Sequence, residues 1–326
     1  MIKESTLNLL KSNKNLLAFS AGIDSSALFF ILLEHNINFD IAIVNYGLRE
    51  QAKEEINYAK ELADRYSKKI YIANAPKFSS NFEANARDFR YNFFNQIITK
   101  HNYNTLLTAH QLNDKLEWLL MQLSNGAGVV ELSGMQEISV NNGYKLVRPL
   151  LEYTKDELLE YLESNNNKYF VDESNKDTKY KRNKYRPISN ALLEFGKNGF
   201  NKSFEILEYE AKNLKNSYKL LFKERELRVI KLENRAILPY ATSYTLKELG
   251  YLLSGKERDL LKVQDSLVAG RKWAVEYSNG LLYIAPYFQS VIPKDIKEKY
   301  RIAKIPPKIR GYLFKEDINI GHLHYH

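Results

Sequence analysis

The sequence predicts an α/β fold: a doubly wound, mostly parallel sheet in the first part of the chain, then a helical region, then a small α+β domain. Two observations predict the sheet. Apolar runs alternate with helical patterns, and the first run passes through a turn of small residues into a helix. Strands are expected at 16–19, 41–45, 69–73 and 103–108, and helices at 26–35, 52–66, 82–101 and 113–124. Because ligands bind beyond the carboxyl ends of such strands, the segments after residues 19, 44 and 108 are expected to meet at one site.

The turn after the first strand has the composition of a phosphate-binding loop. Ala21 and Gly22 let the backbone approach a ligand, and the first N–H groups of the following helix have no partner within the helix. Ser20, Ser25 and Ser26 add hydroxyl donors. Asp24 would repel a bare phosphate, so it indicates a nucleotide that carries Mg²⁺. The alternative is an ordinary helix start that Ser20 or Asp24 caps.

A second polar group follows the strand expected at 103–108. His110, Asp114 and Glu117 are spaced four and three residues apart, which places them on one face of a helix. The opposite face carries leucines, at 112, 116, 119, 120 and 123. The leucine face is therefore expected to join the core, while the other face offers an imidazole and two carboxylates. A plain solvated face is the alternative.

The helix expected at 82–101 also carries charge on one face. Glu83, Arg87 and Arg90 share the spacing of four and three. Such a face can line a binding site, or it can hold an exposed ion pair worth a few tenths of a kcal/mol. Further along, Thr154 and Glu157 have the pattern of a capping box and predict another helix start.

The composition limits the number of domains, the kinds of site and the cellular location that the chain can have. The chain has 326 residues, 44% of them hydrophobic, which is enough for two or three globular domains. It has no cysteine, and this excludes disulfides, iron–sulfur clusters and zinc–thiolate sites. No apolar run approaches the ~20 residues that cross a bilayer, so we expect a cytoplasmic protein.

The positive charge is concentrated in the second part of the chain. Residues 1–175 carry 18 Lys+Arg and 22 Asp+Glu, whereas residues 176–326 carry 30 and 17. This asymmetry predicts a polyanionic partner for the C-terminal part, with an ordinary basic surface as the alternative. Residues 176–186 mix six basic side chains with one acid and two tyrosines, which suits single-stranded RNA. A solvated linker is the alternative there.

The rest of the sequence indicates three segments. A helix is expected over 191–222, another over 256–267 and a hairpin over 273–285, whose Asn279-Gly280 turn is a strong hairpin signal. We predict a nucleotide-binding domain at 1–188, a helical linker at 189–230 and an α+β domain at 231–326. The histidines within 322–326 are expected to be disordered.

Several motifs carry a resemblance to a known family. Ser20-Ala21-Gly22-Ile23-Asp24-Ser25 resembles the PP-loop of ATP pyrophosphatases, with Ala21 in place of a glycine. Together with it, the order of six further motifs resembles the tRNA(Ile)-lysidine synthetases: Asn45 to Arg49, Glu83 to Tyr91, Thr108 to His110, Gly126 to Met135, Arg148 to Leu151, and Asp172 to Arg186. Four residues depart from that family's pattern, namely Tyr46, Gln111, Asn113 and Trp118.

The resemblance implies a ligase that cleaves ATP to AMP and pyrophosphate. In that family, the C2 oxygen of cytidine 34 in the CAU anticodon of an isoleucine tRNA is adenylated, and the amine of free lysine then displaces AMP to give lysidine. The resemblance makes 1–188 the catalytic domain and the later segments tRNA-binding regions. Two other classes stay open: a PP-loop amidating synthetase that acts on a small molecule, and a catalytically silent tRNA-binding protein.

The resemblance also implies roles for particular residues. Asp114 and Glu117 would bind the lysine ammonium, and Asp24 would additionally hold Mg²⁺. The implied catalytic residues are Asp24, Arg87, His110, Asp114 and Glu117; the implied ATP-binding residues are Ser20, Ala21, Gly22, Ile23, Asp24 and Ser25; the implied tRNA-binding residues are Arg90, Lys181, Arg182, Asn183 and Arg186.

Overall fold

The structure is a computed structural model that describes residues 2–47, 51–78, 80–141, 143–171, 181–319 and 321, with the backbone alone for 181–183. The chain forms two compact units, Met1–Glu208 (unit 1) and Tyr209–His326 (unit 2). Helix α8 (Lys181–Asn216) belongs to both, and it leaves helical geometry at Gly196. The segment predicted as a linker, 189–230, is therefore divided between the two units. No helix in the described ranges is long and apolar enough to cross a membrane.

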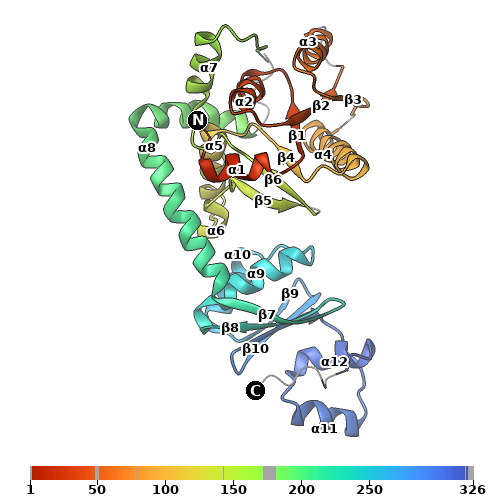
Figure 1. Ribbon diagram of the computed structural model, residues 1–326. Helices are drawn as coiled ribbons and strands as arrows, with labels where there is room; N and C mark the ends of the chain where they lie inside the picture. The colour runs from red at the N-terminus through yellow and green to blue at the C-terminus, as the bar shows by residue number, and fades with distance from the viewer. Residues whose placement is uncertain are drawn as a thin grey trace. The chain divides into compact units, whose positions relative to one another are not determined.

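Unit 1 is built on a six-stranded sheet in the order β3-β2-β1-β4-β6-β5 (Figure 1). Neighbouring strands are parallel except for β5 and β6, which form an antiparallel hairpin. The sequence does not predict this hairpin, because β5 is a short edge strand whose Ile138 and Val140 remain exposed. The strands are β1 (Asn15–Phe19), β2 (Phe39–Asn45), β3 (Ile70–Asn74), β4 (Thr105–Leu107), β5 (Ile138–Asn141) and β6 (Tyr144–Val147).

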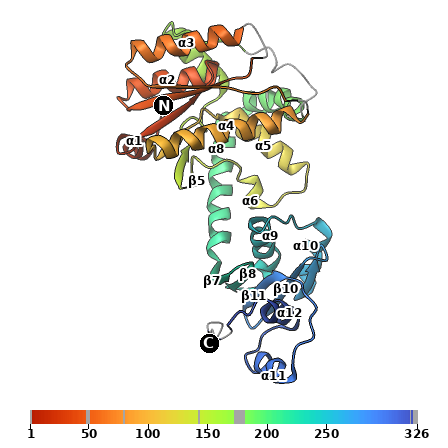
Figure 2. The same ribbon diagram turned by 90° about the vertical axis from the view of Figure 1, so that its right-hand side faces the viewer.

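Helices cover both faces of this sheet, because successive residues of a strand point to opposite sides. Leu17 and Ile41 pack on one side, against α1 (Glu4–Lys11), α2 (Ile23–Glu34), α3 (Gln51–Arg65) and α7 (Lys155–Ser164). Leu16, Ala42 and Leu106 pack on the other side, against α4 (Phe82–His101). Figure 2 shows α2 and α3 on one side of the sheet and α4 on the other. The predicted doubly wound α/β architecture is confirmed.

Two more helices of unit 1 follow β4: α5 (Leu112–Leu123) and the short α6 (Val129–Leu132). Because β1, β2 and β4 are parallel neighbours, their carboxyl ends lie at one edge of the sheet. That edge receives the loop before α2, the segment after β2 and the turn before α5. The three segments therefore begin at the same edge of the sheet, as the sequence predicts, and that they form one binding site stays a prediction.

Unit 2 holds a five-stranded antiparallel sheet in the order β7-β8-β11-β10-β9. One face packs against α9 (Leu238–Glu248), which follows a 3₁₀ turn at Arg235–Ile237, and against α10 (Gly255–Val263). The other face packs against α11 (Lys294–Ile302) and α12 (Pro307–Lys315). The strands are β7 (Tyr218–Glu224), β8 (Leu227–Leu232), β9 (Ser266–Ala269), β10 (Trp273–Ser278) and β11 (Leu281–Pro286).

The predictions for this unit were partly right. Asn279 and Gly280 both have positive φ, 52° and 79°, and they join β10 to β11 as the predicted hairpin. The helix expected over 191–222 is wrong at its end, because 218–222 pair with β8 as part of β7. The helix expected over 256–267 ends at Val263, because Ser266 and Leu267 pair with β10. Long-range strand pairing overrides the local helical pattern in both places.

Candidate active site

The loop between β1 and α2 has the geometry of an anion cradle. Gly22 is the N-cap of α2, with φ −75° and ψ 172°, and no side chain of the described residues caps this helix. The alternative expected from the sequence, a cap by Ser20 or Asp24, is therefore wrong. A Cβ built on Gly22 would have Ser20 Oγ at 3.6 Å and the carbonyl oxygen of Phe170 at 4.0 Å as its nearest neighbours. The helix start thus offers backbone N–H groups and the positive end of its dipole to an anion.

Short-range contacts hold this loop in place. The N–H of Ser20 donates to Ser25 Oγ at 3.2 Å, and Ser25 Oγ donates to the carbonyl of Gly22 at 3.2 Å. The N–H of Phe170 donates to the carbonyl of Ala21 at 2.9 Å. Ser26 is completely buried within α2, so its hydroxyl does not line the cradle as predicted.

Ala21 occupies a position that suits glycine. Its φ is 58°, in the left-handed region, which costs an L residue about 1–2 kcal/mol. The alanine that departs from the PP-loop pattern is therefore a strained substitution, and its buried methyl group lies within the core beneath the loop.

Asp24 lies half-buried in the first turn of α2, beside the cradle. The described residues contain no group of three or more His, Cys, Asp or Glu side chains that could hold a metal ion by themselves. Mg²⁺ in nucleotide sites commonly takes one or two carboxylates and completes its shell with phosphates and water. A single aspartate next to a phosphate cradle fits that donor set.

The turn after β4 differs from the predicted helix face. Gln111 is the N-cap of α5, so His110 precedes the helix and does not share a face with Asp114 and Glu117. Thr108 Oγ1 and His110 Nδ1 lie within hydrogen-bond distance, at 2.9 Å. Asp114 Oδ2 accepts the N–H of Gln111 at 3.0 Å and completes a capping box. Asp114 therefore orders the start of α5 at the carboxyl edge of the sheet.

Glu117 is the buried acid of this helix. It is 2% exposed, and its Oε1 accepts a hydrogen bond from Arg186 Nε of α8 at 3.1 Å. The predicted leucine face is core only at its start, because Leu123 is 53% exposed. The structure thus brings Glu117, predicted to bind lysine, into contact with Arg186, predicted to bind tRNA.

Helix α8 contacts the opposite side of α5 as well. Lys115 is 6% exposed, its Nζ lies 2.5 Å from Glu208 Oε1, and it lies 4.4 Å from the ring centroid of Phe204. The sequence gives no indication of this pair, since the partners are 93 residues apart. Two ion pairs on different sides of α5 therefore connect it to α8.

The first turns of α4 bring arginines to the same sheet edge. Arg87 and Arg90 are exposed, and the Arg87 guanidinium lies 5.0 Å from the ring centroid of Tyr91. Burial raises the pKa of the Tyr46 hydroxyl, while the positive charge of Arg90 lowers it. Arg90 therefore lies near Tyr46, one of the four residues that depart from the family pattern.

Some predicted site residues lie outside the described residues. These are the side chains of Lys181, Arg182 and Asn183, and parts of two family motifs, at 48–49 and 172–180, lie outside them as well.

Known proteins resemble this chain in both sequence and fold. A family model described as a PP-loop domain matches residues 2–192. The chain is 43% identical to the tRNA(Ile)-lysidine synthase of Wolinella succinogenes over 95% of each chain, and 43% identical to that of Campylobacter jejuni over 99% of each. The enzyme of the same name from Helicobacter pylori is 39% identical over 95% of this chain and 92% of its own. The chain belongs to the tRNA(Ile)-lysidine synthase family.

A solved structure supports the fold alone. A U34-tRNA thiolase from Methanococcus maripaludis superposes with a TM-score of 0.52 at 20% identity, over 62% of this chain and 74% of that one. The PP-loop domain identifies an ATP-utilising enzyme, and the family identifies it as a ligase of tRNA modification.

Three of the departures from the family's pattern have structural roles in this chain. Gln111 Oε1 accepts the N–H of Asn113 at 2.5 Å and caps α5. Asn113 joins two other helices, because its Nδ2 donates to Asn190 Oδ1 at 2.8 Å and its Oδ1 accepts the N–H of Lys155 at 3.1 Å. Trp118 Nε1 donates to the carbonyl of Glu131 at 3.1 Å. These side chains therefore stabilise the frame that surrounds His110, Asp114 and Glu117.

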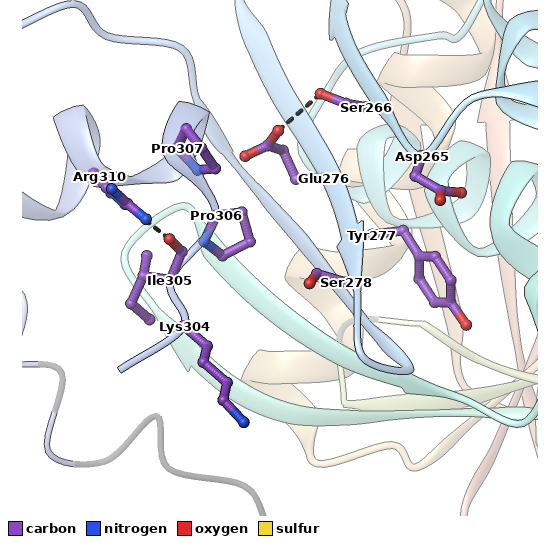
Figure 3. Close-up of a pocket in the computed structure, with 10 residues that line it drawn as sticks. All are labelled: Asp265, Ser266, Glu276, Tyr277, Ser278, Lys304, Ile305, Pro306, Pro307 and Arg310. Atoms are coloured by element: carbon purple, nitrogen blue, oxygen red, sulfur yellow. Dashed lines mark hydrogen bonds between the residues drawn. The ribbon is translucent and has the colours of Figure 1, made fainter. Parts of the chain in front are cut away.

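Unit 2 contains the excess charge and a separate cavity. It carries 22 Lys+Arg against 13 Asp+Glu, whereas unit 1 carries 26 of each. A cavity of about 370 Å³ lies between β10 and the start of α12. Figure 3 shows residues that line it. The buried carboxylate of Glu276 accepts hydrogen bonds there from Ser266 Oγ at 2.8 Å and from the N–H of Lys308 at 2.9 Å. The Glu276 carboxylate thus occupies the start of α12, where a ligand anion would bind. This helix start therefore differs from that of α2 in unit 1.

Proposed function

We propose that this chain forms lysidine in the CAU anticodon of an isoleucine tRNA, at the carboxyl edge of the unit 1 sheet. The C2 oxygen of cytidine 34 attacks the α-phosphorus of ATP, and pyrophosphate leaves. The amine of free lysine then attacks C2, and AMP leaves with the oxygen. The observation that carries the proposal is the start of α2, which no side chain of the described residues caps, at the same sheet edge as the turn that leads to the buried Glu117 and its partner Arg186.

The cradle stabilises the charge that develops on the pyrophosphate. Backbone N–H groups at the start of α2 and the hydroxyl of Ser20 donate to phosphate oxygens as the bond to the α-phosphorus breaks, and Ser25 holds the loop through its bonds to Ser20 and Gly22. Gly22 permits the close approach because a side chain there would occupy the path of the ligand. Asp24 would hold a Mg²⁺ ion, which supplies charge neutralisation at the phosphates.

The acids of α5 serve the incoming lysine. Glu117 and Asp114 attract the ammonium group, and one of them takes the proton that the amine loses before it attacks. Arg186 now contacts Glu117, so the ammonium and the guanidinium compete for one carboxylate. His110 lies four residues before Asp114, in the turn that precedes α5, and adds an imidazole to the two carboxylates.

The tRNA contacts combine local and distant residues. Arg87 and Arg90 bind the anticodon strand near the reacting base, and Lys181, Arg182, Asn183 and Arg186 are further tRNA-binding residues. Unit 2 holds the body of the tRNA through its net positive charge. The protein acts in the cytoplasm, where its substrates are found.

One assay separates this proposal from its alternatives. The full chain is incubated with ATP, radiolabelled lysine and an isoleucine tRNA transcript, and AMP and labelled tRNA are measured. We expect labelled lysine to be incorporated into the tRNA, and AMP to be released, only when lysine and the tRNA are both present with ATP. A transcript with U in place of C34 is the matched control. Release of AMP without tRNA would favour a small-molecule synthetase, and binding of tRNA without lysine incorporation would favour a silent binding protein.

A further inference from the structure

Arg148 directly follows β6, at the same carboxyl edge of the unit 1 sheet as the cradle. Its Nη1 donates to the carbonyl of Gln136 at 2.8 Å and lies 3.2 Å from Ser139 Oγ. Both partners belong to the segment that leads into and forms β5. The hairpin that the sequence does not predict therefore holds one corner of this guanidinium in a fixed position.

The other edge of the Arg148 guanidinium has no acceptor among the described residues. Its Nε is buried and makes no hydrogen bond there, and no hydrogen bond of Nη2 occurs there either. Nε and Nη2 form the edge of a guanidinium that binds two oxygens of one phosphate or carboxylate. A buried N–H without an acceptor is uncommon in folded proteins and calls for a partner from outside.

The charge that acts on Arg148 from α4 is positive. Arg148 also lines a cavity with the carboxylates of Glu137, Glu152, Glu205 and Glu208, none of which pairs with it. Within the described part of the chain, neither Arg148 nor Arg87 has a carboxylate within 4.0 Å of its guanidinium. Burial lowers the pKa of Arg148, and the charge of Arg87 lowers it further, while Tyr91 raises it. The two guanidinium groups therefore lie close enough to repel each other. An anion between them would relieve that repulsion and supply the missing acceptor.

We propose that Arg148, together with Arg87, binds a phosphodiester of the tRNA strand next to the reacting cytidine. This rests on the proposed function, which makes tRNA the substrate at this edge. The position separates this phosphate from those of ATP. The cradle follows β1, whereas Arg148 follows β6, two strands further along the sheet, and adjacent strands are about 4.8 Å apart. The contact holds the strand so that its base reaches the cradle.

The test compares variants of these arginines with a control that loses the same charge elsewhere. Arg148→Met removes the guanidinium, and Arg148→Lys keeps the positive charge but loses the paired N–H donors of Nε and Nη2. Arg87→Met removes the charge of an exposed side chain. Lys100→Met removes an exposed positive charge at the other end of α4. For each protein, tRNA affinity is measured at several salt concentrations, the KM for ATP at saturating tRNA, and the melting temperature.

We expect Arg148→Met and Arg87→Met each to weaken tRNA binding about tenfold and to lower the slope of log affinity against log salt by about 0.7, the value for one contact to a single strand. Arg148→Lys should keep the slope but recover only part of the affinity. Lys100→Met should match the wild type, and the KM for ATP should not change in any variant.

Two results would overturn the proposal. The first is that Arg148→Met and Arg87→Met have the tRNA affinity and salt slope of Lys100→Met, or, where Arg148→Met does not fold, that Arg148→Lys has the tRNA affinity of Lys100→Met. The second is a raised KM for ATP with unchanged tRNA binding, which would identify the anion as a nucleotide phosphate. Failure of the proposed function is seen separately, as a wild-type protein that binds tRNA and forms no lysidine.

Discussion

The cradle can be tested by adding one methyl group, in the variant Gly22→Ala. The backbone at Gly22 suits alanine, because φ is −75° and the nearest contacts of the new Cβ are ordinary ones of 3.6 and 4.0 Å. Replacing glycine at a compatible position stabilises a protein by about 0.4–1 kcal/mol through the unfolded chain. Alanine is also a poorer N-cap than glycine, by about 0.5–1 kcal/mol. The two effects offset each other, so stability should change by less than about 0.5 kcal/mol.

ATP binding should respond far more strongly to the same change. The methyl group fills the space through which phosphate oxygens reach the N–H groups of α2. Loss of one charge-assisted hydrogen bond costs about 1.5–3 kcal/mol, which is about a 10- to 100-fold weaker Kd. Calorimetric titration with ATP and thermal unfolding without ATP measure the two quantities on one preparation.

Gly128→Ala is the matched control for this experiment. Gly128 is the N-cap of α6 with a similar backbone, φ −88° and ψ −179°, and a Cβ there has its nearest contact, Glu131 Oε2, also at 3.6 Å. It should leave both ATP affinity and melting temperature close to those of the wild type. If Gly22→Ala binds ATP as tightly as Gly128→Ala, the phosphates do not approach the backbone at Gly22 and the reasoning fails.

Three further predictions concern the acid near the cradle and two ion pairs. Asp24→Asn should abolish AMP formation and change tRNA affinity less than about twofold, because it alters charge at the phosphates and leaves unit 2 intact; an equal loss of tRNA binding would contradict this. Glu208→Gln should destabilise the protein to urea by about 1–3 kcal/mol, because it leaves the buried Lys115 ammonium with a weaker partner, and adding Lys115→Met should restore most of the loss. No recovery in the double variant would show that the pair is not the cause. Burial raises the pKa of Glu157, but hydrogen bonds from Lys197 and Thr154 outweigh it and hold the pKa below 4.5. The pair therefore stabilises the folded state above about pH 4.5 and loses this effect as the pH falls through the lowered pKa, so wild type and Lys197→Met should differ in urea stability at pH 6 and converge as the pH falls below that pKa.

The features that the sequence determined are those that depend on neighbours along the chain. The alternation of apolar runs and helical patterns predicted the parallel α/β sheet, and the bounds of α4 agree with the expectation at both ends. The Asn279-Gly280 turn predicted its hairpin, because both residues adopt positive φ readily. The PP-loop was recognisable for the same reason, since a strand, a small-residue turn and a helix start are consecutive in sequence.

Only the tertiary structure decided how side chains from distant segments meet. The Glu117–Arg186 contact joins residues 69 apart, and the start of α5 excludes His110 from the helix. The position of Ala21 in the left-handed region follows from the path of the loop, which pairs with Phe170 far along the chain. Residues 218–222 became a strand because β8 offered hydrogen bonds that outweigh a local helical pattern. Periodicity reports which face of an element is apolar, whereas the partner that covers this face is set by packing between segments that the sequence keeps apart.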